Sequence, residues 1–130
     1  MTTIYKNLLY HWLPLIGYCL LIFIQSAYPS TDLIPQPFLF DKFLHIVAYF
    51  ILGILFFRSY RTILIKISHN TLILISISSS ILYGISDEIH QHFVPLRQAD
   101  LMDVLADALG SILGVLMYHL WLKKSGIKAG

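Results

Sequence analysis

The sequence predicts an all-α integral membrane protein, a single domain (residues 1–130) built as a bundle of four transmembrane helices. Of its 130 residues, 57% are hydrophobic and only 12% are charged, and the mean hydropathy is +0.72. Soluble domains carry about twice that share of charge, roughly 25%. Four apolar stretches also approach the roughly 20 residues that a helix needs to cross a bilayer. The length leaves no room for a separate soluble module.

The first apolar stretch runs from about Leu8 to Tyr28. Pro14 lies in its first turns and predicts a local kink, because proline removes a helical hydrogen bond. The stretch is longer than the apolar part of a signal peptide, and the residues Ser26-Ala27-Tyr28 form a poor cleavage site. We therefore expect a first helix that is retained.

Three further stretches follow. The second runs from about Phe43 to Phe57 and is short, so we expect it to begin earlier, with Asp41 and Lys42 in its first turn. The third and fourth run from about Thr71 to Ile89 and from about Leu101 to Leu122. The predicted connections are Pro29–Phe40, Arg58–Asn70 and His90–Ala99.

Charge is distributed unequally between the two ends of the predicted bundle. Most basic residues fall beside the chain termini and the middle connection: Lys6, Arg58, Arg61, Lys66, Lys123, Lys124 and Lys128. The positive-inside rule then predicts that both termini are cytoplasmic. All seven acids belong to the opposite side: Asp32, Asp41, Asp87, Glu88, Asp100, Asp103 and Asp107. A carboxylate near the bilayer centre costs about 2.5–3.5 kcal/mol, so we favour a polar site open to the extracytoplasmic face over chance clustering.

Asp41, His45 and Tyr49 follow one another at helical spacing, so they share one face of the second span. A carboxylate beside an imidazole orients the ring for proton transfer or supports it as a metal ligand. An interfacial Asp–His pair that caps the helix is an equally good interpretation of this motif.

A polar stripe follows the third span and consists of Ser76, Ser80, Tyr83, Asp87 and Gln91, with Glu88 beside it. Such a stripe must pack on other helices or line a cavity, and the serines predict helix–helix contacts. Asp87 and Glu88 are adjacent carboxylates that repel one another if both are ionised. Where water does not screen them, we expect one of the two to be protonated or to be held by a cation.

The short connection to the fourth span contains Arg97. Its guanidinium is the expected counter-ion for the carboxylates or for an anionic ligand such as phosphate. A surface ion pair with Asp100 is the simpler alternative.

Asp100, Asp103 and Asp107 form one stripe at the start of the fourth span. Asp100 suits an N-cap and Asp103 the first helical turn, whereas Asp107 lies about 10 Å deeper, beyond both effects. Gly110 and Gly114 have the spacing that permits close helix pairing, and we expect the third span, with Gly84 and its serines, to be the partner.

Three strings in this order resemble the VanZ-like family: Asp41-Lys42-x-x-His45-x-x-x-Tyr49, Tyr83-Gly84-x-x-Asp87-Glu88-x-x-Gln91, and Arg97-x-x-Asp100-x-x-Asp103-x-x-Ala106-Asp107-x-x-Gly110. The resemblance covers residues 41–114. It implies a multi-pass protein of the bacterial cytoplasmic (inner) membrane with a role in the cell envelope, since the family is named for a member linked to teicoplanin resistance. Many members carry asparagine where this chain has Asp107, so the resemblance does not imply that this charge is required.

The sequence favours binding of, or chemistry on, a lipid or a polyprenyl-linked envelope precursor at the outer leaflet. The candidate catalytic residues are His45, Glu88, Asp41 and Asp87, with His45 oriented by Asp41 and paired with Glu88 for proton transfer. The candidate substrate-binding residues are Arg97, Lys42, Tyr49, Gln91, Asp103 and Asp107. Asp87, Asp103 and Asp107 are the candidate ligands of a divalent cation, and their oxygen atoms suit magnesium or calcium.

Two other functions stay open. A non-catalytic structural or partner protein would use the polar network only to fix helix register. A small cation-coupled transporter would need a pathway across the membrane. In the sequence, the stripe of charged residues stops at Asp107 and does not continue inward. The sequence does not predict nucleic-acid binding, because the chain has neither a basic arm nor a zinc-finger spacing.

Overall fold

A computed structural model describes residues 2–29, 38–64 and 66–126, and its regular elements over these residues are all helices. They are α1 (Thr3–Asn7), the π-helical segment η1 (Leu8–Trp12), α2 (Leu13–Ala27), α3 (Phe38–Tyr60), α4 (His69–His92) and α5 (Leu101–Lys124). Within the described residues, four helices are long and apolar enough to cross a membrane, the first being the continuous run Thr3–Ala27. The prediction of an all-α bundle with four spans is confirmed, and each span is a few residues longer than its apolar stretch.

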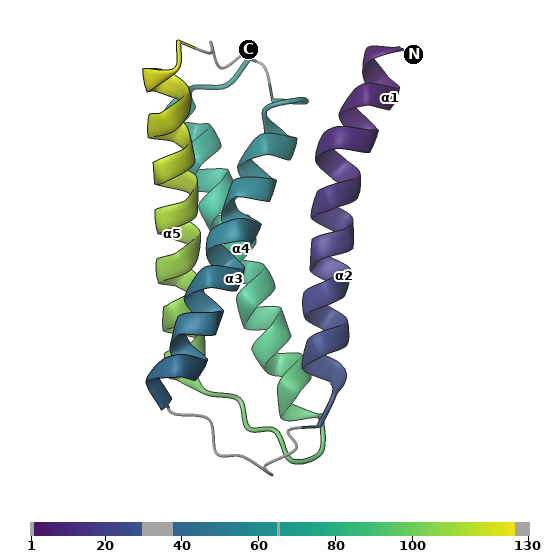
Figure 1. Ribbon diagram of the computed structural model, residues 1–130, viewed down its shortest axis with the longest axis vertical. Helices are drawn as coiled ribbons and strands as arrows, with labels where there is room; N and C mark the ends of the chain where they lie inside the picture. Colours follow the sequence, from purple (N-terminus) through teal and green to yellow (C-terminus); the bar gives the residue numbers. More distant parts are fainter. Residues whose placement is uncertain (1, 30–37, 65, 127–130) are drawn as a thin grey trace.

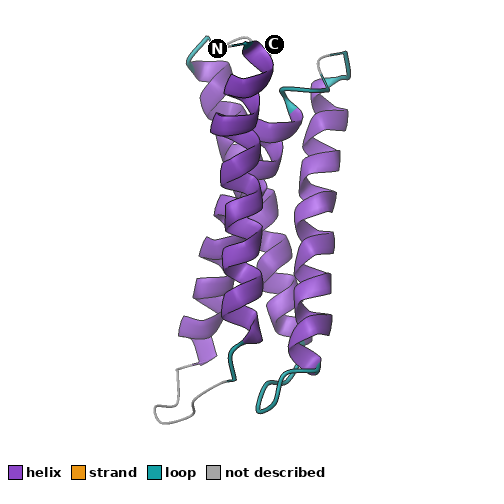
Figure 2. Ribbon diagram, turned by 90° about the vertical axis from the view of Figure 1, so that its right-hand side faces the viewer, coloured by secondary structure: helices purple, strands orange, loops and turns teal. Residues whose placement is uncertain are grey.

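The beginning of α1 and the end of α5 lie at the same end of the bundle, which we call the terminal end (Figure 1). The opposite end, here the loop end, contains the last turn of α2, the first turn of α3 and the connection from α4 to α5. Helices α3, α4 and α5 pack closely, and α2 stands beside α3 and α4 (Figures 1 and 2). Two charged residues used in the topology prediction, Asp32 and Lys128, lie outside the described residues.

Pro14 is accommodated at the start of α2 by the π-helical segment that precedes it. A proline leaves carbonyl groups of the preceding turn without their helical donors, and such groups need other partners inside a membrane. The carbonyl oxygen of Tyr10 accepts a hydrogen bond from Arg58, and that of His11 accepts one from Ser59. The sequence predicts a kink at Pro14; the structure has a change of helical type just before it, and two hydrogen bonds join this segment to α3.

The closest helix contact is between α3 and α5, and glycines make it possible. A Cβ atom on Gly110 would collide with the carbonyl oxygen of Ile46, and one on Gly114 with that of Phe50. The expectation that these glycines pack against the third span is therefore wrong, because their surface faces α3. Helix α4 contacts α5 at Ser111, the residue after Gly110, where the Oγ atoms of Ser80 and Ser111 lie 2.7 Å apart.

The interior changes character along the bundle. In the terminal half, the buried core consists mainly of apolar residues, namely Phe57, Leu72, Val115 and Leu122, and its buried polar residues are serines such as Ser59 and Ser76. In the loop half, the buried residues include four carboxylates, a carboxamide and a serine: Ser26, Asp87, Glu88, Gln91, Asp103 and Asp107. Burying charged groups without partners is costly. The buried carboxylates therefore indicate that a functional site lies in the loop half.

Candidate functional site

The first part of the site joins the beginning of α3 to the beginning of α5. The ammonium group of Lys42 lies 2.6 Å from an oxygen of Asp100 and 2.5 Å from one of Asp103, with Asp41 at 3.4 Å. Asp100 also caps α5, because its side chain accepts the backbone N–H of Met102. The hydrogen bond from Lys42 holds the pKa of the Asp100 carboxyl below its ordinary value.

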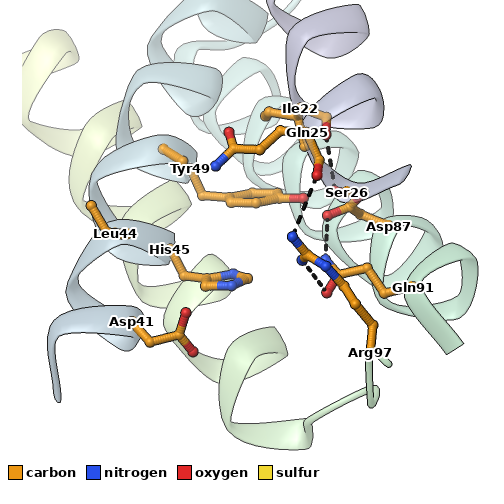
Figure 3. Close-up of a pocket in the computed structure, with 11 residues that line it drawn as sticks. Ile22, Gln25, Ser26, Asp41, Leu44, His45, Tyr49, Asp87, Gln91 and Arg97 are labelled. Atoms are coloured by element: carbon orange, nitrogen blue, oxygen red, sulfur yellow. Dashed lines mark hydrogen bonds between the residues drawn. The ribbon is translucent and has the colours of Figure 1, made fainter. Parts of the chain in front are cut away.

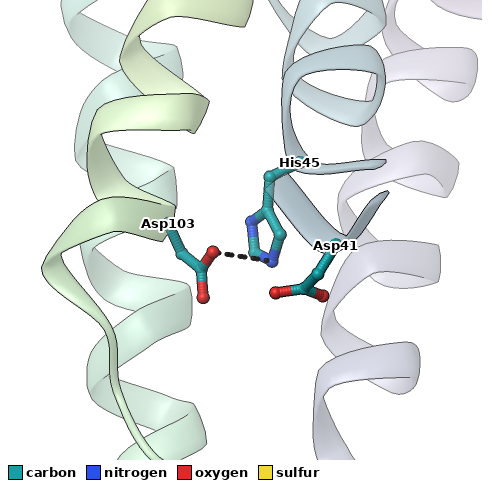
Figure 4. A group of neighbouring side chains, drawn as sticks. All are labelled: Asp41, His45 and Asp103. Atoms are coloured by element: carbon teal, nitrogen blue, oxygen red, sulfur yellow. Dashed lines mark ion pairs between the residues drawn. The ribbon is translucent and has the colours of Figure 1, made fainter. Parts of the chain in front are cut away.

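His45 lies one turn further into α3 and is placed between two aspartates of α5. Its Nδ1 is 2.9 Å from Oδ1 of Asp107, and its Nε2 is 3.7 Å from Oδ1 of Asp103. Figure 4 shows the His45 ring between the carboxylates of Asp103 and Asp41. The closest carboxylate to the ring is that of Asp107, whereas the sequence favours Asp41 for this role.

The adjacent carboxylates of α4 have different partners. Oε2 of Glu88 accepts the backbone N–H of Asp100 at 3.0 Å, which places Glu88 beside the start of α5. Oδ2 of Asp87 accepts a hydrogen bond from the amide of Gln91, one turn along α4. The two acids therefore belong to two neighbouring parts of the site, and their carboxylates do not share one hydrogen-bond partner.

Arg97 reaches from the α4–α5 connection back to the end of α2. Its guanidinium donates to Oε1 of Gln91 and to the backbone carbonyl oxygens of Tyr28 and Gln25. The preceding residue, Leu96, has a φ of 64°, a left-handed conformation that costs a non-glycine residue about 1 kcal/mol or more. Among the described residues, Arg97 forms no ion pair with a carboxylate, so it is not the direct counter-ion that the sequence favours.

The group around His45 and the group formed by Asp87, Gln91 and Arg97 border a polar pocket of about 120 Å³ between α2, α3 and α4. In Figure 3 the His45 ring and the Arg97 guanidinium face one another across this pocket, with the Tyr49 ring above them and Asp41 below His45. The polar residues that line it are Gln25, Ser26, Asp41, His45, Tyr49, Asp87, Gln91 and Arg97. The arrangement offers carboxylate, imidazole, amide and guanidinium groups to one small ligand.

The structure brings most of the sequence-predicted residues to this end of the bundle. Asp41, His45, Tyr49, Asp87, Gln91 and Arg97 line the pocket. Lys42, Glu88, Asp103 and Asp107 lie beside it, around His45 and the start of α5. Lys42 faces Asp100 and Asp103, so its ammonium is already held by two carboxylates.

Donor atoms for a cation gather around His45 in two overlapping groups among the described residues. One group is Asp41, His45 and Asp103, and the other is His45, Glu88 and Asp107, with the ligand atoms of each within 4.8 Å of one another. Asp87, a candidate ligand in the sequence, belongs to neither group.

The sequence reasoning missed the contribution of the first span. Gln25 and Ser26 line the pocket, and the carbonyls of Gln25 and Tyr28 receive Arg97. The presence of a glutamine and a serine near the end of the first apolar stretch indicates this contribution, because polar groups in a membrane span need a partner.

Four helices long and apolar enough to cross a membrane, with a buried polar site at one end of the bundle, define the chain as a small multi-pass membrane protein. Its sequence matches the profile of the VanZ/LLP1 family over residues 7–122. The chain therefore belongs to the VanZ/LLP1 family, and the match extends beyond the motif-bearing residues on both sides. No curated protein sequence and no solved structure matches the chain.

Proposed function

We propose that the protein binds a lipid or a lipid-linked envelope precursor, whose polar head group occupies the pocket between α2, α3 and α4. The observation that carries the proposal is the position of this pocket beside an apolar groove on the same helices. The groove has a volume of about 550 Å³ and is lined by Trp12, Leu15, Ile16, Cys19, Leu20, Phe23, Phe56 and Tyr83.

The groove and the pocket follow one another along two helices. On α2 the groove is lined as far as Phe23, and the pocket by Ile22, Gln25 and Ser26. On α4, Tyr83 lines the groove, and Asp87, one turn further toward the loop end, lines the pocket. An amphiphile with its head group at the loop end would thus place its hydrocarbon chain along the groove, toward the middle of the bundle.

The pocket suits a head group that combines hydroxyl or amino groups with a phosphate. The carboxylates of Asp41 and Asp87 accept hydrogen bonds from hydroxyl or amino groups, while Arg97 binds phosphate well. When no cation is bound at His45, this residue is the group best placed for proton transfer, since Asp107 fixes its ring, and Glu88 is its proposed partner. Handling of such a precursor would connect this site to the cell envelope and to glycopeptide susceptibility.

The proposal places the loop end at the extracytoplasmic face and both termini in the cytoplasm. At the terminal end the described residues carry Lys6, Arg58, Arg61, Lys66, Lys123 and Lys124, against Lys42 and Arg97 at the loop end. The positive-inside rule supports this orientation.

Single cysteines test the orientation. In a Cys19→Ala background, we expect Phe93→Cys, which is exposed at the loop end, to react with a membrane-impermeant maleimide in intact cells. Lys124→Cys at the terminal end should react only after the membrane is opened. The reverse pattern of labelling would refute the proposed orientation.

Lipid retention tests the proposed ligand class. The protein, purified in a mild detergent from bacterial membranes, should retain a defined lipid that mass spectrometry detects. Asp87→Asn with Arg97→Gln alters the pocket, and Leu20→Trp fills the groove. We expect each change to reduce the retained lipid at least about tenfold, which corresponds to about 1.4 kcal/mol of binding energy.

Leu120→Trp is the matched control for the groove variant, because Leu120 is exposed on α5 and does not line the groove. Equal retention by the wild type, the pocket variant and the groove variant would contradict the proposal. Comparison of lipid pools in cells with and without the protein then identifies the molecule. Unchanged lipids together with reduced abundance of the pocket variant would favour a purely structural network.

The transport alternative receives no support from the interior. Between the site and the terminal end, the described core contains Leu52, Phe57 and Val115 and four buried serines, Ser59, Ser76, Ser80 and Ser111, but no buried charged residue. The hydroxyl groups of these serines are all engaged in hydrogen bonds within the bundle, whereas a pathway for ions would need charged groups or a water-filled cavity at this level.

A further inference from the structure

We propose that His45, Glu88 and Asp107 form a site for a divalent transition-metal ion of the zinc class. The three side chains come from three different helices, α3, α4 and α5, and one ligand atom of each lies within 4.8 Å of the others. One imidazole and two carboxylates are a combination that binds zinc, and three protein ligands leave one coordination position for a fourth group.

Unsatisfied oxygen atoms provide a second, independent observation. Glu88 and Asp107 are only 4% and 1% exposed, and Oε1 of Glu88 and Oδ2 of Asp107 have no hydrogen-bond partner among the described residues. A buried carboxylate oxygen without a partner is costly. A cation bound between the two carboxylates would compensate their charge, and each carboxylate has an oxygen that is open to coordination.

The groups around the three ligands hold them in place. The other oxygen of Glu88 accepts the N–H of Asp100, and the other nitrogen of His45 faces Asp103 at 3.7 Å. A carboxylate behind a ligating imidazole is the common outer partner of a metal-bound histidine. The ammonium group of Lys42 is held by Asp100 and Asp103, so it is not the partner of the open oxygens of Glu88 and Asp107.

The identity of the ligands decides the class of metal. The three aspartates favoured from the sequence suit magnesium or calcium, which prefer oxygen ligands. The set that the structure brings together contains an imidazole, and imidazole suits zinc and its neighbours in the first transition row.

Metal binding by the full chain in lipid nanodiscs tests the proposal. After treatment with a chelator, the wild type should take up one Zn²⁺ per chain, and an excess of Mg²⁺ should not displace it. Glu88→Gln and Asp107→Asn should each bind Zn²⁺ at least about tenfold more weakly, since even outer-shell changes weaken metal sites by about 10- to 100-fold. Asp87→Asn is the matched control: it removes the carboxylate next to Glu88 and should leave Zn²⁺ uptake unchanged.

Cobalt provides a second readout, which does not require any variant to fold. Co²⁺ in the wild type should show the visible absorption bands of a four-coordinate ion, and Zn²⁺ should abolish them. No uptake of either metal, or equal uptake by wild type, Glu88→Gln and Asp107→Asn, would overturn the proposal and leave the two carboxylates to share a proton. The test is separate from that of lipid binding, because Asp87→Asn is expected to keep the metal.

Discussion

Replacing Gly114 by alanine is expected to destabilise the folded protein by about 1–3 kcal/mol, the usual cost of an over-packed interior. The added methyl group would collide with the backbone carbonyl of Phe50 on α3. A backbone group cannot rotate away as a side chain can, so α3 and α5 would have to separate. Thermal unfolding in detergent and the amount of protein in the membrane measure the effect.

Gly17→Ala is the matched control for this experiment. A Cβ atom at Gly17 meets nothing within 4 Å, although the residue also lies in a membrane helix. Alanine is the better helix former by about 1 kcal/mol, so this variant should be as stable as the wild type or slightly more stable. A Gly114→Ala protein that unfolds with the wild type would show that α3 and α5 do not approach as closely as the structure indicates.

Replacing Lys42 by methionine should have the second large effect. Its ammonium group is the partner of both Asp100 and Asp103, and the side chain of Asp103 is only 9% exposed. Removing one member of a buried ion pair leaves an uncompensated charge and costs about 3–5 kcal/mol. We expect a lower unfolding temperature and reduced abundance, even though methionine is the more hydrophobic residue.

The double variant Lys42→Met with Asp103→Asn should recover part of this loss, because the second change removes a charge that the first leaves unpaired. Lys66→Met, at an exposed lysine of the terminal end, controls for the loss of a positive charge alone. Equal stability of Lys42→Met and Lys66→Met would mean that the contacts of Lys42 contribute little to the fold.

Much of the fold follows from the sequence because each helix carries its own signal. The apolar stretches predicted the four spans, and their helical period placed Ser76, Ser80, Asp87 and Gln91 on one face of α4, which the structure buries. The N-cap role of Asp100 was also predicted, and its side chain accepts the N–H of Met102. These features depend on spacing within one segment.

The pairing between helices could not be predicted in the same way. Periodicity shows which residues share a face of one helix, but it does not say which neighbouring helix that face meets. For this reason the sequence pairs the glycines of α5 with α4, whereas they contact α3, and it pairs His45 with Asp41, whereas the ring contacts Asp107. The hydrogen bonds of Arg97 to Gln25 and Tyr28 could not be predicted from the sequence either, because they use backbone carbonyls, which every residue has.

The contact between Arg97 and the end of α2 links occupancy of the pocket to the docking of the first helix. The guanidinium that would meet an anionic head group already holds the carbonyls of Gln25 and Tyr28. An anion that draws Arg97 away must therefore loosen the last turn of α2, and by reciprocity a loosened α2 frees Arg97 for the anion. Because α2 also forms one wall of the apolar groove, the same movement would widen the groove beside the pocket. Binding of an anionic head group at Arg97 and displacement of α2 would then favour one another.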